Sequence, residues 1–125
     1  SKEDARRAIE ISCSGIVISN HGGRQLDGSR SSFDQLKEIM DEVGDEIDVL
    51  FDSGVQRGTH VLKALSLGAK AVGIGRMYLY PLAAAGQTGV EKALGLMHAE
   101  LERGMKLMGK TTISQLNHKN LRFRD

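Results

Sequence analysis

Residues 49–58 read VLFDSGVQRG, and this stretch decides the fold because a short apolar run ends there in an acidic residue and a glycine loop. The apolar residues at 49–51 favour a strand that ends at Asp52. The loop 53–58 leads into a predicted helix that Thr59 caps, with apolar residues at 61, 62 and 65 and Gly68 at its end. The segment therefore predicts one strand–loop–helix unit.

The same kind of unit is predicted on both sides of this segment. Before it, the β-branched run at 15–19 predicts a strand, and Ser32 is the expected N-cap of a helix with apolar residues at 33, 36, 39, 40 and 43 that closes at Gly44. The run shows no apolar–polar alternation, which is typical of a strand buried on both faces. After it, a strand at 71–75 leads to Arg76, and apolar residues at 90, 94, 97, 101 and 105 predict a long helix over 88–107. A capping box at 1–4 predicts a first helix, and a short helix is expected within 111–125.

Strands that alternate with helices predict a parallel α/β fold with right-handed crossovers. No linker or composition shift divides residues 1–125, so we treat them as one domain. Three strands are fewer than the eight of a barrel of this type, which needs about 250 residues. A three-stranded parallel sheet would also leave strand edges open. We therefore expect the chain to be part of a larger structure or to cover its sheet with a partner.

The composition is that of an ordinary globular protein and excludes some classes of function. Lys and Arg number 17 against 16 Asp and Glu, which leaves a net charge of +1, and only 4% of the residues are aromatic. Such a chain has neither the positive electrostatic potential nor the aromatic stacking surface that binds nucleic acid, so we expect no nucleic-acid partner. No apolar run approaches the ~20 residues of a membrane span, and no signal-peptide pattern opens the chain. The lone Cys13 excludes an internal disulfide and suits a small packed residue in a cytoplasmic protein.

The residues best suited to chemistry follow the first strand, where residues 19–28 read SNHGGRQLDG. Reacting groups in α/β proteins lie past the carboxyl ends of the strands. His21 can take up a proton near neutral pH, and Arg24 can grip a carboxylate through two hydrogen bonds. Gly22 and Gly23 would let a ligand approach the backbone. The alternative interpretation is a surface loop that contains a histidine and a glycine turn.

Glycines and a cation also follow the second and third strands, at 52–58 and 73–76. Two consecutive strand ends of this kind resemble the phosphate site of (β/α)₈ barrels, and an N-terminal helix end favours an anion. The alternative is that these glycines only make tight turns between strand and helix. No G-x-G-x-x-G motif opens a helix after the first strand, so a dinucleotide site is not predicted.

The other chemically capable residues are interpreted as structural. His60 is expected to face solvent, and His98 and His118 have no metal-ligand spacing with Cys13 or a carboxylate. We therefore predict no metal site.

Residues 19–27, SNHGGRQLD, resemble the active-site signature of the FMN-dependent 2-hydroxy acid dehydrogenases and oxidases, a family that includes lactate oxidase, glycolate oxidase and mandelate dehydrogenase. Residues 51–55, 57–58 and 61–65 resemble the strand, phosphate loop and helix that follow in this family. Residues 67–72 and 75–76 resemble its last barrel strand. The similarity runs from about residue 3 to about residue 109, with the motifs in family order.

The resemblance implies an oxidoreductase that converts a small L-2-hydroxy acid of the lactate or glycolate type to the 2-oxo acid, with FMN as electron acceptor. It implies that His21 is the catalytic base and that Arg24 binds the substrate carboxylate. It further implies that Ser19 lies against the flavin. The expected contacts to the ribityl chain and phosphate are Asp52, Ser53, Gly54, Val55, Gln56, Gly75 and Arg76.

The chain departs from the family pattern in three respects. Gln56 stands where the family has an arginine expected to bind the FMN phosphate, and Met77 replaces a proline. The chain also matches only strands six to eight of an eight-stranded TIM barrel. We therefore expect the isolated chain to be inactive and to self-associate as a homo-oligomer. Two alternatives stay open: a non-catalytic phosphate- or anion-binding half-barrel module, and a purely structural fragment.

Overall fold

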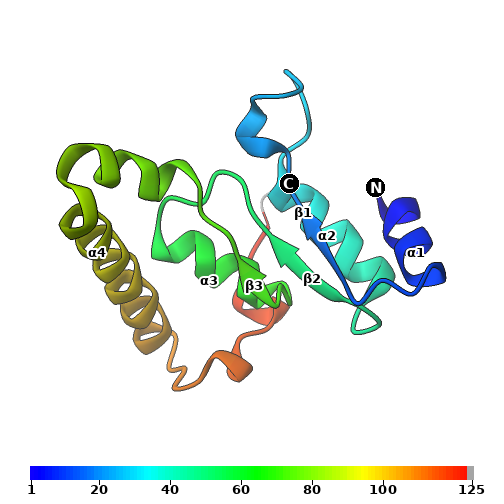
Figure 1. Cartoon of the computed structure of the whole chain (residues 1–125). Helices are drawn as coiled ribbons and strands as arrows, with labels where there is room; N and C mark the ends of the chain where they lie inside the picture. The colour runs from blue at the N-terminus through cyan, green and yellow to red at the C-terminus, as the bar shows by residue number, and fades with distance from the viewer. Residues whose placement is uncertain (124–125) are drawn as a thin grey trace.

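Three parallel strands in the order β1-β2-β3 form the sheet in the computed structural model, which describes residues 1–123 (Figure 1). Residues 15 to 18 of β1 pair in register with residues 48 to 51 of β2, and Leu50 and Phe51 pair with Ala71 and Val72 of β3. The predicted α/β class with a parallel sheet is therefore confirmed. In chain order the helices and strands are α1 (Lys2–Glu10), β1 (Gly15–Ile18), α2 (Ser32–Val43), β2 (Asp48–Phe51), α3 (Gly58–Ser66), β3 (Ala71–Val72) and α4 (Arg76–Leu107).

The core lies between the sheet and the helices α1, α2 and α3. Helix α1 packs on α2, α2 packs on β1 and β2, and α3 packs on β3, while α4 packs on the outer side of α3 (Figure 1). Phe33 of α2 meets Phe51 of β2 edge to face, with ring centroids 6.2 Å apart. The buried core residues are Ala5, Ile18, Leu36, Ile39, Val43, Ile47, Val49, Phe51, Val55, Ala64, Leu67 and Ala69.

The expectation that β1 is buried on both faces is wrong for this chain. Ile18 and Val49 are buried, whereas Val17 is 62% exposed and Leu50 is 36% exposed. Side chains alternate across a strand, so the helices cover one face of the sheet and leave the other face open. The apolar run at 15–18 therefore places valine in contact with solvent.

Two predicted helix starts lie too late in the sequence, by one residue in α2 and by two residues in α3. Ser31, not Ser32, is the N-cap of α2, because its hydroxyl accepts the Phe33 N–H, and Ser32 is buried as the first helical residue. Helix α3 begins at Gly58 instead of being capped by Thr59, and its first N–H is satisfied from α4. The capping box at the start of α1 is confirmed, with Asp4 N–H donating to the Ser1 hydroxyl.

The region after β2 differs more from expectation. Strand β3 ends at Val72 because its partner β2 ends at Phe51, and the Gly73 N–H makes the last bond, 2.8 Å long, to the Phe51 carbonyl. The predicted helix over 88–107 is present, but a helical segment that was not predicted starts at Arg76 and joins it as α4 across a bend at Ala85 and Gly86, where Gly86 has a φ of 58°. Only glycine adopts such a φ readily, so the bend falls there.

The remaining predictions concern the turn after α1 and the tail. Cys13 is exposed rather than packed, because it lies in the turn between α1 and β1. The tail forms two short 3₁₀ turns, Ile113–Gln115 and His118–Asn120, in place of a helix, and the last two residues of the predicted segment lie outside the described residues. Within residues 1–123, no helix combines the length and apolar character needed to cross a membrane.

Candidate functional site

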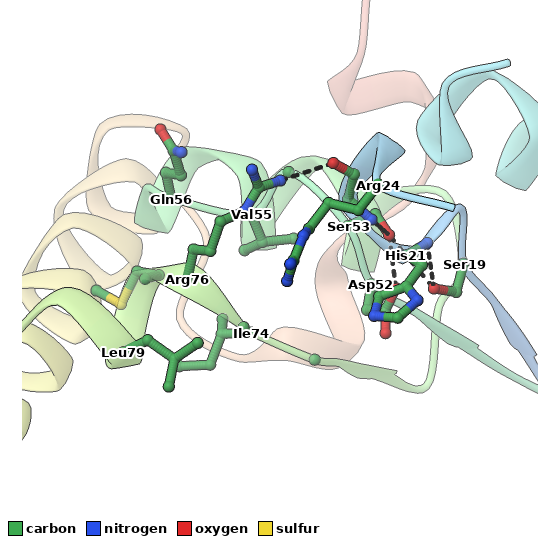
Figure 2. Close-up of a pocket in the computed structure, with 15 residues that line it drawn as sticks. Ser19, His21, Arg24, Asp52, Ser53, Val55, Gln56, Ile74, Arg76 and Leu79 are labelled. Atoms are coloured by element: carbon green, nitrogen blue, oxygen red, sulfur yellow. Dashed lines mark hydrogen bonds between the residues drawn. The ribbon is translucent and has the colours of Figure 1, made fainter. Parts of the chain in front are cut away.

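The loops that follow the three strands meet at one edge of the sheet and enclose a cavity of about 230 Å³ (Figure 2). Parallel strands bring their carboxyl ends to the same edge, which explains why segments far apart in sequence converge here. Every residue predicted for the site lines this cavity: Ser19, His21, Arg24, Asp52, Ser53, Gly54, Val55, Gln56, Gly75 and Arg76.

The cavity has further lining residues beyond these ten, of which Gly22, Gly73 and Ile74 lie in segments that the sequence interpretation had singled out and Leu79 does not. Gly22 and Gly73 line the cavity with their backbone, and Ile74, Met77 and Leu79 supply an apolar wall. Leu79 lies one turn into α4. Leu79 reaches the cavity because α4 begins at Arg76. The apolar spacing at residues 90–105 gave no sign of a helix that begins so early.

The segment that carries His21 is a tight 3₁₀ turn, His21–Gly23, in which three consecutive residues have positive φ. The values are 54° at His21, 65° at Gly22 and 72° at Gly23. The Asn20 side chain closes the turn, since its Oδ1 accepts the Gly23 N–H at 3.2 Å and its Nδ2 donates to the Arg30 carbonyl at 3.2 Å. The two glycines are required here by the backbone conformation.

Arg24 and Arg76 bring positive charge to the cavity from different strand ends (Figure 2). Arg76 donates from Nη2 to the Gly22 carbonyl at 2.8 Å, which ties the end of β3 to the turn after β1. A guanidinium carries five N–H donors, so most of this group remains available to an anion. Within the described residues Arg24 makes no ion pair, and its guanidinium is free for a carboxylate.

Arg57 takes no part in the cavity, because Glu100 of α4 holds it. The Glu100 carboxylate accepts from Arg57 Nε at 2.8 Å and from the Gly58 N–H at 2.9 Å. The Arg57 guanidinium and the Gly58 N–H lower the pKa of Glu100, and the carboxylate in turn raises the pKa of Arg57. The start of α3 was predicted to bind an anion, and the Glu100 carboxylate of the same chain occupies that position.

The start of α4 is the helix end that faces the cavity. Its N-cap, Gly75, makes no side-chain cap, and residues 75–77 all line the cavity. Free N–H groups beside the Arg76 guanidinium form a donor set that suits a phosphate group.

Gln56 also lines the cavity and carries no charge, and its backbone N–H donates to Nδ1 of His60 at 3.3 Å. His60 is thus half-buried and hydrogen-bonded, which corrects the expectation that it faces solvent.

Comparison with known proteins gives a family for this arrangement. The sequence model of the FMN-dependent dehydrogenase family matches residues 1–123. The chain belongs to the FMN-dependent dehydrogenase family. It is 49% identical over 120 residues to an FMN-dependent alpha-hydroxy acid dehydrogenase of Penicillium citrinum, an alignment that covers 96% of this chain and 30% of that protein.

Two further family members show the same partial coverage. The chain is 50% identical over 119 residues to the L-lactate dehydrogenase (cytochrome) of Saccharomyces cerevisiae, covering 91% of this chain and 20% of that protein. Its structure matches a flavocytochrome b2 variant with sulfite bound at a TM-score of 0.93 and 48% identity, covering 97% of this chain and 33% of the other. The chain therefore spans 20–30% of the length of these two curated relatives.

The cofactor of this FMN-dependent family suits the cavity at its phosphate end. The Arg76 guanidinium and the uncapped start of α4 offer donors for a phosphate. Val55, Ile74 and Leu79 provide an apolar flank beside them. Within residues 1–123, no cluster of His, Cys, Asp and Glu has the arrangement of a metal site.

Proposed function

We propose that the protein carrying this chain oxidises a small L-2-hydroxy acid, of the lactate or glycolate type, to the 2-oxo acid with FMN as electron acceptor. The observation that carries the proposal is the convergence of His21 and Arg24, which follow β1, and Arg76, which follows β3, on one cavity. The family membership and the names of its relatives support the same reaction.

In this proposal the two cationic residues hold opposite ends of the site. Arg24 binds the substrate carboxylate through paired hydrogen bonds, which orients the 2-hydroxyl carbon. Arg76 and the first N–H groups of α4 hold the FMN phosphate, and Asp52, Gly54 and Gly75 line the path of the ribityl chain. Ser19 lies against the flavin.

His21 is the proposed base. Its imidazole accepts one proton from the 2-hydroxy acid as the substrate is oxidised. Bound FMN would supply the two-electron acceptor. The His21–Gly23 turn holds the imidazole beside Arg24, so that the carboxylate and the reacting carbon of one small substrate reach both residues.

The decisive experiment replaces His21 by Gln in the protein that carries this chain. Loss of a positioned base should lower kcat for L-lactate or glycolate by about 100-fold or more. Bound flavin, measured by its visible absorbance, should stay at the wild-type level because His21 is not a phosphate contact. Turnover at the wild-type rate would refute the assignment of His21 as base.

We further propose that the 125 residues form strands six to eight of a TIM barrel and do not turn over substrate alone. Three features support this: the open sheet face, the partial coverage of the relatives, and a His21 imidazole without a hydrogen-bond partner among the described residues. Purified chain that is yellow and oxidises L-lactate or glycolate would contradict it.

The uncapped start of α4 beside Arg76 also favours a second candidate, a non-catalytic anion-binding module. Inorganic phosphate and FMN binding distinguish the two functions. If the intact protein binds both ligands, binds them equally after His21→Gln, and never oxidises a hydroxy acid, the module is the correct function.

A further inference from the structure

Serine hydroxyls hold the backbone turn that carries His21. Three consecutive N–H groups, those of Asn20, His21 and Gly22, all donate to serine side chains. The Gly22 N–H donates to Ser53 Oγ at 3.1 Å, and the His21 N–H donates to Ser19 Oγ at 3.0 Å. The Asn20 N–H is shared between Ser32 Oγ at 3.0 Å and Ser53 Oγ at 3.2 Å.

Ser53 is the member of this group that comes from a different strand end. We propose that Ser53 is a positioning residue, which fixes the turn on both sides of His21 and thereby aims the imidazole into the cavity (Figure 2). The effect on catalysis rests on the function proposed above. The fixing of the turn by the Ser53 hydroxyl is independent of that function.

The bonding capacity of the Ser53 hydroxyl is fully used inside the protein. A serine hydroxyl has one donor and two acceptor positions. Here it accepts the N–H groups of Asn20 and Gly22 and donates to Asp52 Oδ1 at 2.8 Å, and the Ser19 hydroxyl lies 3.3 Å away as a further partner. The Asp52 carboxylate therefore orients the hydroxyl so that both lone pairs face the turn. The side chain serves the His21 turn, although Ser53 as a residue lines the cavity.

Backbone strain at Ser53 and at His21 also indicates that the two turns need the hydrogen bonds between them. Ser53 has a φ of 82° and His21 a φ of 54°, a region that residues other than glycine adopt at a cost. Gly54 and Gly22 stand next to them, so glycine is present in each turn yet does not occupy these two positions. Hydrogen bonds between the two turns compensate for this strain, and Ser53 Oγ makes those at Asn20 and Gly22.

Arg76 closes the turn from its other side, since it donates to the carbonyl of the same Gly22 whose N–H meets Ser53. Gly22 is thus held at both its N–H and its carbonyl by the ends of β2 and β3. A side chain at Gly22 would collide with this arrangement, because a Cβ there would lie 2.5 Å from Arg76 Nη2. The position of the His21 turn is therefore set by tertiary contacts as well as by its own sequence.

Amide hydrogen exchange tests the hold on the turn in two variants, Ser53→Ala and Ser53→Gly. Both remove the hydroxyl, but only Gly also relieves the positive φ, so a common effect reports the hydroxyl. We expect exchange at Gly22 to rise on the order of tenfold in both variants. The rise at Asn20 should be smaller, because Ser32 retains part of that bond.

The control is Ser66→Ala, which removes a buried hydroxyl that has no hydrogen-bond partner among residues 1–123. It should leave exchange at residues 20–23 unchanged. The Gly73 amide, bonded to the Phe51 carbonyl, should stay protected in every variant and reports that the sheet is folded. Unchanged exchange at Gly22 in either Ser53 variant would overturn the proposal.

A second measurement concerns catalysis in the protein that carries the chain. Ser53→Gly should lower kcat for the hydroxy acid, because the His21 turn loses the hydroxyl that holds the N–H groups of Asn20 and Gly22. Faster exchange at Gly22 with an unchanged kcat would overturn the positioning role. Absence of hydroxy acid oxidation in the wild type would instead refute the proposed function, and the exchange result would still decide whether Ser53 holds the turn.

Discussion

Two arginines, Arg57 and Arg76, lie in the glycine-containing segments after β2 and β3, and the contacts of each decide what it can bind. Arg57 is next to Gln56 in sequence, but Glu100 engages it outside the cavity. Arg76 lines the cavity and donates one hydrogen bond to the Gly22 carbonyl. At the proposed phosphate end of the cavity, Arg76 therefore supplies the positive charge, since Gln56 is neutral and Arg57 is held in an ion pair with Glu100.

This difference gives a prediction about cofactor affinity. Arg76→Ala should weaken FMN binding by about 1.5–3 kcal/mol, the range of a hydrogen bond to a charged group. Arg57→Ala is the matched control and should leave FMN affinity near the wild-type value. Titration of the flavin-free protein with FMN and riboflavin measures both effects. If riboflavin affinity falls as much as FMN affinity in Arg76→Ala, Arg76 does not act on the phosphate.

At the scale of elements, the contact between α3 and α4 depends on glycine at Gly58, where an added Cβ would meet the backbone of α4, whereas at Gly104 it would meet only the end of a leucine side chain. A Cβ at Gly58 would meet the Met97 carbonyl and would lie 2.5 Å from the Leu101 nitrogen. A Cβ at Gly104 would lie 2.8 Å from Leu62 Cδ1. Since α4 begins with the residues that face the cavity, this close packing helps to place the phosphate donors.

We predict that Gly58→Ala lowers the free energy of unfolding by about 1–3 kcal/mol, because the backbone of α4 cannot yield to the added methyl group. Gly95→Ala on the exposed side of α4, with no atom within 4 Å of the added Cβ, should raise it by about 0.5–1 kcal/mol. Chemical denaturation of both variants makes the comparison. Equal effects would show that α3 and α4 do not depend on close approach at Gly58.

The same contact makes stability depend on pH through Glu100. Arg57 and the Gly58 N–H hold its pKa below the ordinary value of 4.5 in the folded protein. A lowered folded pKa means that this stabilisation is fully present above about pH 4.5 and is lost as the pH falls through the folded pKa.

Glu100→Gln should therefore show a smaller loss of stability on acidification than the wild type, measured as the denaturation midpoint at neutral pH and below pH 4.5. Glu91→Gln is the control, since Glu91 bonds only Gln87 of its own helix among the described residues. A pH dependence in Glu100→Gln equal to that of the wild type would contradict the role of this carboxylate.

At the scale of the whole molecule, the sheet leaves an apolar face and two strand edges uncovered. Val17 and Leu50 point to the open face, and β1 and β3 are both edge strands. Open parallel edges with exposed β-branched residues favour association with another chain.

We therefore predict that the 125-residue chain self-associates when it is alone. Sedimentation velocity at tens of micromolar should show a species larger than the 13.6 kDa monomer. Val17→Lys should shift the distribution towards the monomer, while Lys37→Ala on α2, away from the sheet face, should not. A monomeric wild-type chain at this concentration would refute the prediction.

Local sequence was sufficient to predict much of the fold, because apolar runs favour strands and helices and glycines end helices through interactions between residues close in sequence. It predicted the order of strands and helices and the parallel sheet, whereas the full set of predicted site residues came from the resemblance to the family and did not include Leu79. It misplaced the N-cap of α2 by one residue, because Ser31 and Ser32 are equally good caps and only burial of Ser32 distinguishes them. It also missed the helical start at Arg76, since that helix continues directly from the strand and contains Pro81.

The family, the turn around His21 and the donor groups of the site follow from the sequence by itself, because residue type and spacing specify them. Only the tertiary structure decided which groups remain available for a ligand. Glu100 comes from a helix more than forty residues away and occupies both Arg57 and the start of α3. Ser53 and Arg76 reach the His21 turn from neighbouring strand ends. Such contacts depend on how elements meet in space, and a hydrogen bond between distant residues leaves no periodic signal in the chain.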